Sequence, residues 1–417
     1  MSRRVVVTGL GCITPLGNNV SDFTRALQEG ESGAGLITRF DTEDFDVKIA
    51  CEVQGFSLAD FLDRAQAKSF RRTGLTSHYA LAAAEEAMEE AGIALQDIGD
   101  PFRASSIMGV GIGDIGSFEK QVNTLAKKGP GKVSAFTVPK LMPNSAAADI
   151  ANRFQLHGDS FTLNSACSSA TNAIGMAFRA IKEGHYDLIV TGGAEATVTP
   201  TTIAGFSAMG AITKQYNNDP RAASRPFDLH RSGFVTGEGA GVLILEDRER
   251  AMKRRANILA EVVGYGGTND AGHITQPCET GEYAARAIRL ALNEARIPSR
   301  KVDYINAHGT STPLNDKTET LAIKRALRAY AQSVAISSTK SMHGHALGAA
   351  GALEAIVAIE AMRTGVVPPT INLDDHDPEC DLNYTPNEAR ERRIKYALSE
   401  TFGFGGHNGV VLFKKVA

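Results

Sequence analysis

Two kinds of hydrophobic spacing alternate along the chain. Short apolar runs rich in β-branched residues recur, and they are RVVVTG from 4, SSIMGVG from 105, DLIVTGGAE from 187, GAGVLILE from 239, VDYINAHG from 302, VAISSTK from 334 and NGVVLFKK from 408. Such runs are typical of buried strands. Alanine-rich stretches with helical spacing lie between several of them, such as SHYALAAAEEAMEEAG from 77 and YAARAIRLALNEARI from 283. The alternation predicts a layered α/β architecture with at least partly parallel sheets.

A weak internal duplication relates the two halves of the chain. The segment DSFTLNSACSSATNAIGMAFRAIKEG can be aligned with SVAISSTKSMHGHALGAAGALEAIVAIEAMRTG, and each is a strand, a polar turn and a helix rich in Ala and Gly. The alignment puts Cys167 and His345 at comparable places and predicts that two small-residue helices approach closely in the centre. Helices of this composition are also common in unrelated α/β proteins, so the pattern alone leaves both interpretations open.

The expected boundary between the halves is the charged segment 246–257, which separates residues 1–250 from residues 251–417. No Pro- or Ser-rich linker lies there. We therefore expect the two halves to pack as one body.

Composition narrows the class of protein. The 417 residues are 43% hydrophobic and 22% charged, as in a soluble α/β enzyme. The net charge of -3 argues against nucleic-acid binding. No apolar run reaches the roughly 18 residues of a membrane span, and MSRRVVVTGLG enters a strand pattern at once, so we expect a cytoplasmic protein.

The cysteines suggest neither disulfides nor zinc. They are odd in number, widely spread and free of CxxC spacing. We interpret four of them as small buried hydrophobic residues, namely Cys12, Cys51, Cys278 and Cys380.

Two glycine-rich segments resemble phosphate-binding loops only in part. GIGDIG at 111–116 has the letters of a dinucleotide-binding fingerprint, but no Asp or Glu lies between Glu119 and Asp149 to hold a ribose. GFGGHNG at 403–409 lacks the Gly-Lys-Ser/Thr ending of a phosphate loop. We expect no nucleotide at either and interpret the second as a tight turn that presents backbone N–H groups.

Cys167 is the candidate nucleophile. It lies in LNSACSSATNAIG, where a strand-like run changes to a helix-like one. The N–H groups and dipole at a helix start favour a thiolate, although a buried inert cysteine is an equally common explanation. The serines Ser165, Ser168 and Ser169 add polarity that an inert cysteine would not need.

Two histidines strengthen the chemical interpretation. His308 in INAHGTSTP directly follows a strand, and His345 in STKSMHGHALG directly precedes a helix. One imidazole could act as a base, or both could donate hydrogen bonds to an oxyanion. His343 and His407 are additional candidates nearby. A metal site is not expected, because His343 and His345 have no third ligand at a recognisable spacing.

With these residues in view, the chain resembles the β-ketoacyl-acyl-carrier-protein synthases of the thiolase superfamily, most closely the type II elongating enzymes. The resemblance covers essentially the whole chain. It is carried by RVVVTGLGCITPLG, SACSSA, VTGGAE, SRPFD, NAHGTSTPLND, STKSMHGHALGAAGALE, VPPTINLD and FGFGGHNGVVLF, in that order. It implies a thiolase-like fold of two pseudo-duplicated βαβαβαββ halves in five αβαβα layers.

The resemblance also implies roles for individual residues. Cys167 would take an acyl chain from the carrier protein as a thioester. His308 and His345 would assist malonyl decarboxylation and stabilise the enolate, whose Claisen condensation extends the chain by two carbons. The N–H groups of Cys167 and Phe404 would form an oxyanion hole, and the Phe404 ring would be a gate behind the acyl chain. No cofactor is implied, because phosphopantetheine arrives on the carrier protein.

Supporting positions are implied as well. Lys340 and Glu319 would form a buried charged pair that holds the histidines, and Ile112 and Phe206 would line the acyl pocket. The partners would be acyl- and malonyl-carrier proteins and a second copy of the chain. The basic side chains that receive the acidic carrier protein would be Lys68, Arg71 and Arg72.

Some positions depart from the pattern of the family. His343 and His407 stand where Thr is frequent, Asp114 where Gly is common, and Gly210 where a basic residue for the carrier protein is expected. These departures affect the expected chain length and partner, and leave every reacting position in place.

Related enzymes and a non-enzyme are the alternatives. A degradative thiolase would carry a second cysteine in the C-terminal loop, and Cys380 lies outside it. A type III initiating synthase would use one histidine and an asparagine. A polyketide ketosynthase has nearly the same motifs and stays open. A chain-length-factor-like partner usually lacks the nucleophile, so Cys167 argues against it.

Overall fold

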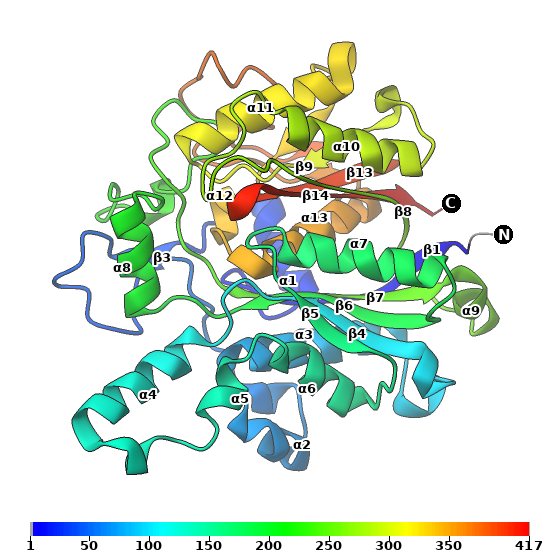
Figure 1. Ribbon diagram of the computed structural model, residues 1–417. Helices are drawn as coiled ribbons and strands as arrows, with labels where there is room; N and C mark the ends of the chain where they lie inside the picture. The colour runs from blue at the N-terminus through cyan, green and yellow to red at the C-terminus, as the bar shows by residue number, and fades with distance from the viewer. Residues whose placement is uncertain (1–2, 417) are drawn as a thin grey trace.

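The computed structural model, which describes residues 3–416, stacks its elements in layers (Figure 1). From the bottom of that view upward they are a helical layer, a sheet, a central pair of helices, a second sheet and a second helical layer. The α/β layering predicted from the hydrophobic pattern is confirmed.

Strands from both halves of the described chain form one hydrogen-bonded system of ten. The strands of the first half are β1 (Val5–Ile13), β4 (Ala104–Gly109), β5 (Ser160–Leu163), β6 (Leu188–Glu195) and β7 (Gly239–Asp247). Those of the second half are β8 (Ala260–Asn269), β9 (Tyr304–Asn306), β10 (Ala335–Ser337), β13 (Tyr396–Gly403) and β14 (His407–Lys415). The runs that the sequence predicted as strands all lie on these elements.

The two halves repeat one strand order. Across the sheet the order is β5-β4-β6-β7-β1, followed by β8-β14-β13-β9-β10. If the strands of each half are numbered along the chain, both halves read 3-2-4-5-1 from the outer edge inward. β4 and β9 are each parallel to both neighbours, whereas β7 and β14 are each antiparallel to both neighbours. The internal duplication seen in the sequence is therefore a repeated topology.

The central layer consists of α7 (Ser169–Lys182) and α13 (Ala350–Thr364), which pack on each other between the sheets (Figure 1). A Cβ added at Gly351 of α13 would lie 2.0 Å from Thr171 Oγ1 of α7. Only glycine fits such a close approach. α13 is buried on nearly all sides, which explains why its sequence is apolar around its whole circumference.

The outer faces of the sheets are covered by the remaining long helices. α3 (Leu75–Ala91) and α6 (Ser145–Phe154) lie below, and α10 (Glu282–Glu294) and α11 (Pro313–Leu327) lie above (Figure 1). The helices predicted from 77 and from 283 are α3 and α10.

Shorter elements connect the layers. They are α1 (Val20–Glu29), α2 (Arg64–Ser69), α4 (Ile115–Lys128), α5 (Thr137–Leu141), α8 (Pro200–Met209), α9 (Arg248–Lys253) and α12 (Lys340–His343), with the strand pairs β2 (Gly35–Leu36) with β3 (Ile49–Ala50) and β11 (Val366–Val367) with β12 (Arg390–Glu391). Within residues 3–416, no helix combines the length and hydropathy needed to cross a bilayer.

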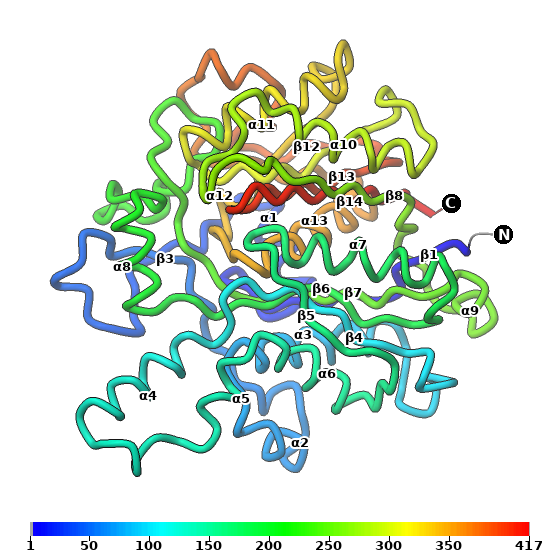
Figure 2. Tube along the Cα trace, in the orientation of Figure 1, coloured from blue at the N-terminus to red at the C-terminus, as the bar shows by residue number. Residues whose placement is uncertain are grey.

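The halves join where β1 pairs with β8, through Val5–Val7 and Ala260–Val262. Between β7 and β8 the chain passes through α9. Both ends of the described chain lie on the same side of the molecule (Figure 2).

Candidate active site

Cys167 lies in the turn between β5 and α7 and is only 6% exposed. The preceding residue, Ala166, has a left-handed φ of 51°. Ser169 Oγ donates to the Ala166 carbonyl at 2.6 Å and accepts from the Ser165 N–H at 3.0 Å. Ser168 Oγ donates to the first carbonyl of β14 at 2.7 Å. The serines therefore hold a turn that is unfavourable for a non-glycine backbone, and this explains their presence around the thiol.

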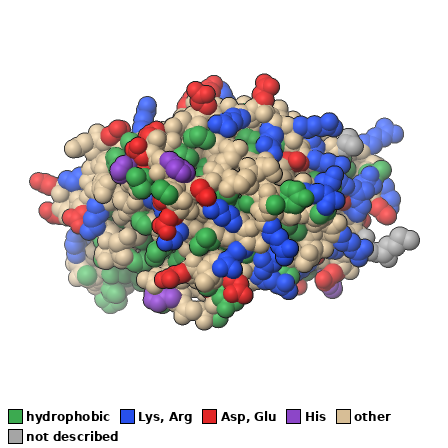
Figure 3. All heavy atoms as spheres, turned by 90° about the horizontal axis from the view of Figure 1, so that it is seen from above, with side chains coloured by type: hydrophobic (Ala, Val, Ile, Leu, Met, Phe, Trp, Pro, Cys, Tyr) green, Lys and Arg blue, Asp and Glu red, His purple; other side chains and the backbone are tan. Residues whose placement is uncertain are grey.

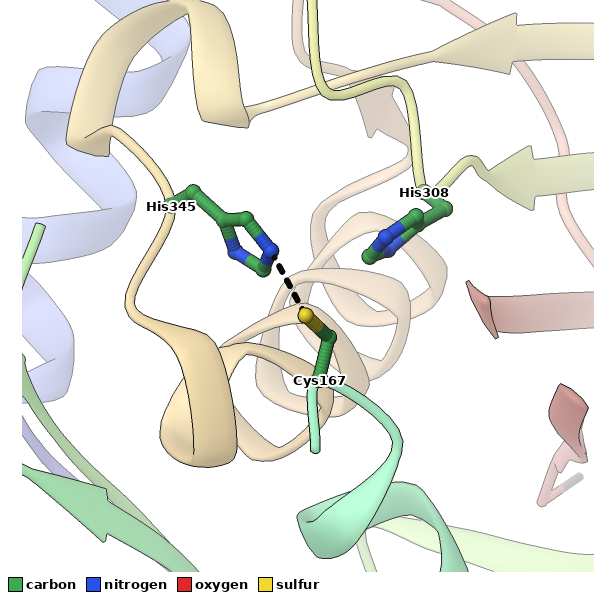
Figure 4. A group of neighbouring side chains, drawn as sticks. All are labelled: Cys167, His308 and His345. Carbon is green, nitrogen blue, oxygen red and sulfur yellow. Dashed lines mark hydrogen bonds between the residues drawn. The ribbon is translucent and has the colours of Figure 1, made fainter. Parts of the chain in front are cut away.

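His308 and His345 come from the second half of the chain and point toward Cys167 (Figure 4). His345 Nε2 lies 3.1 Å from Cys167 Sγ. The two imidazole rings are 5.3 Å apart and nearly perpendicular, and one donor atom of each of the three residues lies within 4.8 Å of the others. No carboxylate belongs to this group, so it is a thiol with two imidazoles. The fold brings together the three residues that the sequence singled out.

A backbone hydrogen bond determines which nitrogen of His345 carries the hydrogen. The Leu347 N–H donates to His345 Nδ1 at 3.3 Å. Since Nδ1 accepts, the hydrogen of the neutral ring is on Nε2, and Nε2–H donates to Cys167 Sγ. This tautomer favours hydrogen-bond donation over proton abstraction, the two roles that the sequence left open.

Both imidazoles are uncharged at neutral pH. Burial holds the pKa of His308 and of His345 well below 6.5, and the nearby Lys340 ammonium lowers both further. Neutral rings can donate hydrogen bonds to a bound molecule. They add no positive charge that would stabilise a carboxylate group of that molecule.

The thiol of Cys167 is less acidic than its place before a helix suggested. Burial raises its pKa to about 11, while Lys340 and the backbone N–H groups of Phe404 and Cys167 itself act in the opposite direction. Removal of the sulfur from water therefore outweighs the nearby donors and the start of the helix, which favour the thiolate.

Lys340 and Glu319 do not form the predicted pair. Lys340 Nζ donates to Glu354 of α13, and both of these side chains are buried. Glu319 instead accepts the N–H groups of His308 at 2.6 Å and Gly309 at 2.7 Å. The reason is that α13 lies in the central layer, whereas α11, which carries Glu319, covers the other face of the upper sheet (Figure 1).

The GFGGHNG segment is the predicted tight turn, between β13 and β14. Gly405 and Gly406 have φ values of 80° and 75°. Gly403 passes so close to the nucleophile turn that a Cβ there would lie 3.1 Å from Cys167 N. This approach brings the Phe404 N–H to the thiol, as the effect of that group on the pKa of Cys167 shows.

A cavity of about 370 Å³ opens beside the three residues. Its wall includes Cys167, His308, His345, Phe404, Phe234, Leu347, Phe402 and Met209. Ile112 and Phe206 do not line this cavity. They pack against the apolar cluster that contains Cys167 and Leu347, and the Phe206 ring lies 5.2 Å from that of Phe234.

The positions that depart from the resemblance have separate structural roles. His343 is fully buried, which lowers its pKa to about 3, and it bonds a threonine hydroxyl at 3.0 Å. His407 is half-buried and contacts Asn269. Asp114 caps the start of α4, and Gly210 ends α8 with φ 71° and lines the cavity. Neither extra imidazole belongs to the group of Cys167, His308 and His345.

The predicted carrier-protein patch is exposed on the lower side of Figure 1, on α2 and the turn after it. Its members are Lys68, Arg71 and Arg72, and the Arg72 guanidinium lies 4.8 Å from the centre of the Phe136 ring. Seen from above, Lys and Arg side chains are most crowded on the right side of the molecule (Figure 3).

Sequence comparison agrees with the site. Residues 2–251 match the N-terminal domain of beta-ketoacyl synthases, and residues 259–374 match their C-terminal domain. The chain belongs to the β-ketoacyl synthase family. The thiolase-like ketosynthase fold and the condensing acyltransferase class predicted from the sequence are confirmed.

This β-ketoacyl synthase has close relatives along its full length. It is 45% identical over 413 residues to 3-oxoacyl-[acyl-carrier-protein] synthase 2 of Synechocystis sp., with 99% of this chain and 98% of that one covered. It is 43% identical over 414 residues to the protein of that name from Coxiella burnetii, with 99% of both chains covered.

Solved structures of ketosynthases superpose on the whole chain. A type II polyketide ketosynthase in complex with its acyl-carrier protein matches with a TM-score of 0.91 at 34% identity, covering 100% of both chains. A beta-ketoacyl synthase from Burkholderia phymatum matches with a TM-score of 0.91 at 35% identity and the same coverage.

Sequence reasoning missed three buried acids near the site. Glu195, at the end of β6, accepts N–H groups from the 111–113 loop and from Gly348. Glu354 pairs with Lys340, and Glu400 lies on β13. Glu354 is an acid inside the apolar run GALEAIV, and that is the signal that could have identified it, whereas Glu400 lies between Ser399 and Thr401 and gives no such signal.

Proposed function

We propose that this β-ketoacyl synthase is the type II elongating enzyme, which condenses malonyl-acyl-carrier protein with an acyl chain held on Cys167. The observation that carries the proposal is the meeting of one thiol with two uncharged imidazoles. That set can bind an acyl group and stabilise an enolate without a metal or cofactor. The full-length relatives named 3-oxoacyl-[acyl-carrier-protein] synthase 2 support the same activity.

Acyl transfer is the first step. Cys167 Sγ attacks the thioester carbonyl of acyl-carrier protein, and the N–H groups of Cys167 and Phe404 stabilise the oxyanion. The carbon–sulfur bond to phosphopantetheine breaks, and the proton that leaves the Cys167 thiol is taken up by the departing sulfur. The Nε2–H of His345 stabilises the sulfur while it carries negative charge.

Decarboxylation and condensation follow. The carbonyl oxygen of malonyl thioester accepts hydrogen bonds from His308 and His345, carbon dioxide leaves, and the electron pair forms an enolate. The enolate carbon attacks the Cys167 thioester, the carbon–sulfur bond to Cys167 breaks, and the β-ketoacyl chain stays on the carrier protein. Cys167 leaves as a thiolate and takes up a proton from water, which restores the thiol. Burial keeps both imidazoles neutral for this step, and the Lys340 ammonium lowers their pKa further.

Glu319 and Lys340 have supporting roles that differ from each other. Glu319 fixes the backbone of His308 and Gly309, and Lys340 acts through its charge. The Phe404 ring closes the cavity behind the acyl chain, while Ile112 and Phe206 limit chain length from behind the apolar wall.

The partners are carrier proteins and a second copy of the chain. The exposed Lys68, Arg71 and Arg72 receive the acidic carrier protein. β5 is an outer edge strand, which offers unpaired backbone groups to a copy of itself. Exposed apolar side chains on α4, on α5 and at the end of α5 support the same homodimer, and they are Phe118, Val122, Leu125, Val138 and Met142. Free cysteines agree with a cytoplasmic location.

A polyketide ketosynthase is the second candidate, favoured by the matching type II polyketide structure at 34% identity. The higher identity of 43–45% to the type II synthases favours the first.

Acylation by defined substrates tests the proposal. The protein is mixed with medium-chain acyl-carrier protein, and intact mass and peptide fragments are recorded before and after malonyl-carrier protein is added. We expect an acyl adduct on Cys167 that is converted to a β-ketoacyl product. The adduct should be lost in Cys167→Ala and kept in Cys278→Ala. Transfer of polyketide intermediates alone would support the second candidate, and no adduct with any acyl group would refute both.

A further inference from the structure

Glu400 is a buried acid that the proposed reaction does not use. Its side chain is fully buried on β13, and neither carboxyl oxygen has a hydrogen-bond donor within residues 3–416. A carboxylate without donors is strongly disfavoured in such a place, whereas a neutral carboxylic acid is tolerated.

The strand register places Glu400 directly beside the histidine loop. β13 runs parallel to β9, and Ser399 is the partner of Asn306, so Glu400 comes level with Ala307, the residue before His308. Two residues further along β13, the Phe402 ring lies 5.9 Å from the His308 ring.

Glu400 faces α11 and its acid Glu319. Leu398 belongs to the apolar cluster under α10 and α11, and Glu400, two residues later, shares that face of the strand. α10 and β14 contribute apolar side chains to this cluster, namely Ala287, Ile288, Ala291 and Val410. Burial is the main cause that raises the pKa of Glu400, and the neighbouring charge of Glu319 raises it further.

The charged side chains around Glu319 form ion pairs with other residues. Asp316, one turn earlier on α11, accepts from Phe227 N–H and faces Arg231. Lys340 donates to Glu354. Within the described chain, no Lys or Arg side chain forms an ion pair with Glu319 or Glu400. Ionisation of both carboxyl groups would therefore bury two unpaired negative charges, which is strongly destabilising.

We propose that Glu400 is a positioning residue for His308 that works as a neutral acid, so that Glu319 alone carries negative charge beneath the histidine loop. Burial raises the pKa of Glu319 to about 8, while the N–H groups of Gly309 and His308 and the Lys340 ammonium lower it. Glu319 therefore ionises more readily than Glu400, which has no donor, and as a carboxylate it holds both N–H groups. If Glu400 lost its proton, a second negative charge would stand behind His308 and oppose the charge that develops on the enolate. Decarboxylation would slow, while the Cys167 thiol could still be alkylated.

The pH dependence of stability tests this directly, and it does not depend on the proposed function. Wild type, Glu400→Gln and the surface control Glu282→Gln are unfolded in urea between pH 5 and pH 9. A carboxyl whose pKa is raised by folding stabilises the fold below its ordinary pKa and loses this effect as pH rises. Relative to Glu400→Gln, the wild-type unfolding constant should therefore rise by about tenfold per pH unit until Glu400 ionises. The control should follow wild type, and parallel curves for wild type and Glu400→Gln would overturn the proposal.

Decarboxylation tests the positioning role, which rests on the proposed function. Release of carbon dioxide from malonyl-carrier protein should fall from pH 7 to pH 9 more in wild type than in Glu400→Gln, with both active at pH 7. Loss of activity at pH 7 in a folded Glu400→Gln would refute the neutral-acid role. If that variant does not fold, Glu400→Met, which has similar volume and no charge, takes its place in both experiments. Failure of the proposed function itself would appear as wild-type protein that makes no β-ketoacyl product.

Discussion

The Gly403→Ala substitution tests whether the Phe404 N–H stabilises the oxyanion. The new Cβ would lie 2.9 Å from Ser165 O and 3.1 Å from Cys167 N. Ordinary contacts are roughly 3.5 Å, so the FGFGG turn must move away from the nucleophile turn by about 0.5 Å. The backbone of Gly403 has φ -103°, which alanine adopts freely, so the effect is purely steric. Overpacking of this kind costs about 1–3 kcal/mol of stability.

The movement weakens one of the two oxyanion donors. Complete loss of such a donor lowers kcat by roughly 10²–10³, so we expect acyl transfer to Cys167 to slow by about 10- to 100-fold. Intact-mass measurement after rapid mixing with acyl-carrier protein gives the rate, and alkylation by iodoacetamide reports whether the thiol is still reachable. Gly205→Ala, in open space on α8, is the matched control. Acylation of Gly403→Ala at the wild-type rate would refute the oxyanion assignment.

Three further predictions concern charge. In Lys340→Met with Glu354→Gln, the pKa of His308 and of His345 should rise because the ammonium is gone, and the acid limb of activity should move to higher pH. NMR titration of the two imidazoles measures these pKa values, and unchanged values would contradict the prediction. Iodoacetamide alkylation of Cys167 should speed up about tenfold per pH unit from pH 7 to pH 9, and a plateau near pH 7 would instead indicate a preformed thiolate. Arg71→Glu with Arg72→Glu should raise KM for acyl-carrier protein and leave kcat unchanged, measured at low salt, whereas a change in kcat alone would place the docking surface elsewhere.

The catalytic group depends on the duplication as a whole. Cys167 comes from the first half, and both histidines come from the second. The equivalent strand–turn–helix units end beside each other because their helices, α7 and α13, approach closely where Gly351 leaves room for the Thr171 side chain. A larger residue at Gly351 would therefore separate the nucleophile from its donors as well as disturb the core.

The sequence by itself determined the elements and the repeat, and it singled out the three residues that the fold brings together. Strand runs, alanine-rich helices and the polar turns around Cys167 and His345 are local patterns. They depend on residues close together in the chain, so they can be recognised in the sequence alone. The glycine turn at 403–409 was predictable for the same reason, because its conformation depends on residues that are adjacent in the chain.

Only the tertiary structure decided the partners and charges of the site. Lys340 pairs with Glu354 and not with Glu319, because the helices that carry the two acids lie on opposite faces of one sheet. The spacing of residues along the chain does not reveal on which face of a sheet a helix packs. The thiol of Cys167 and the acid of Glu400 keep their protons because the assembled core removes them from water. Desolvation depends on all the atoms that surround a group in space, so its effect on a pKa cannot be predicted from any single segment of the sequence.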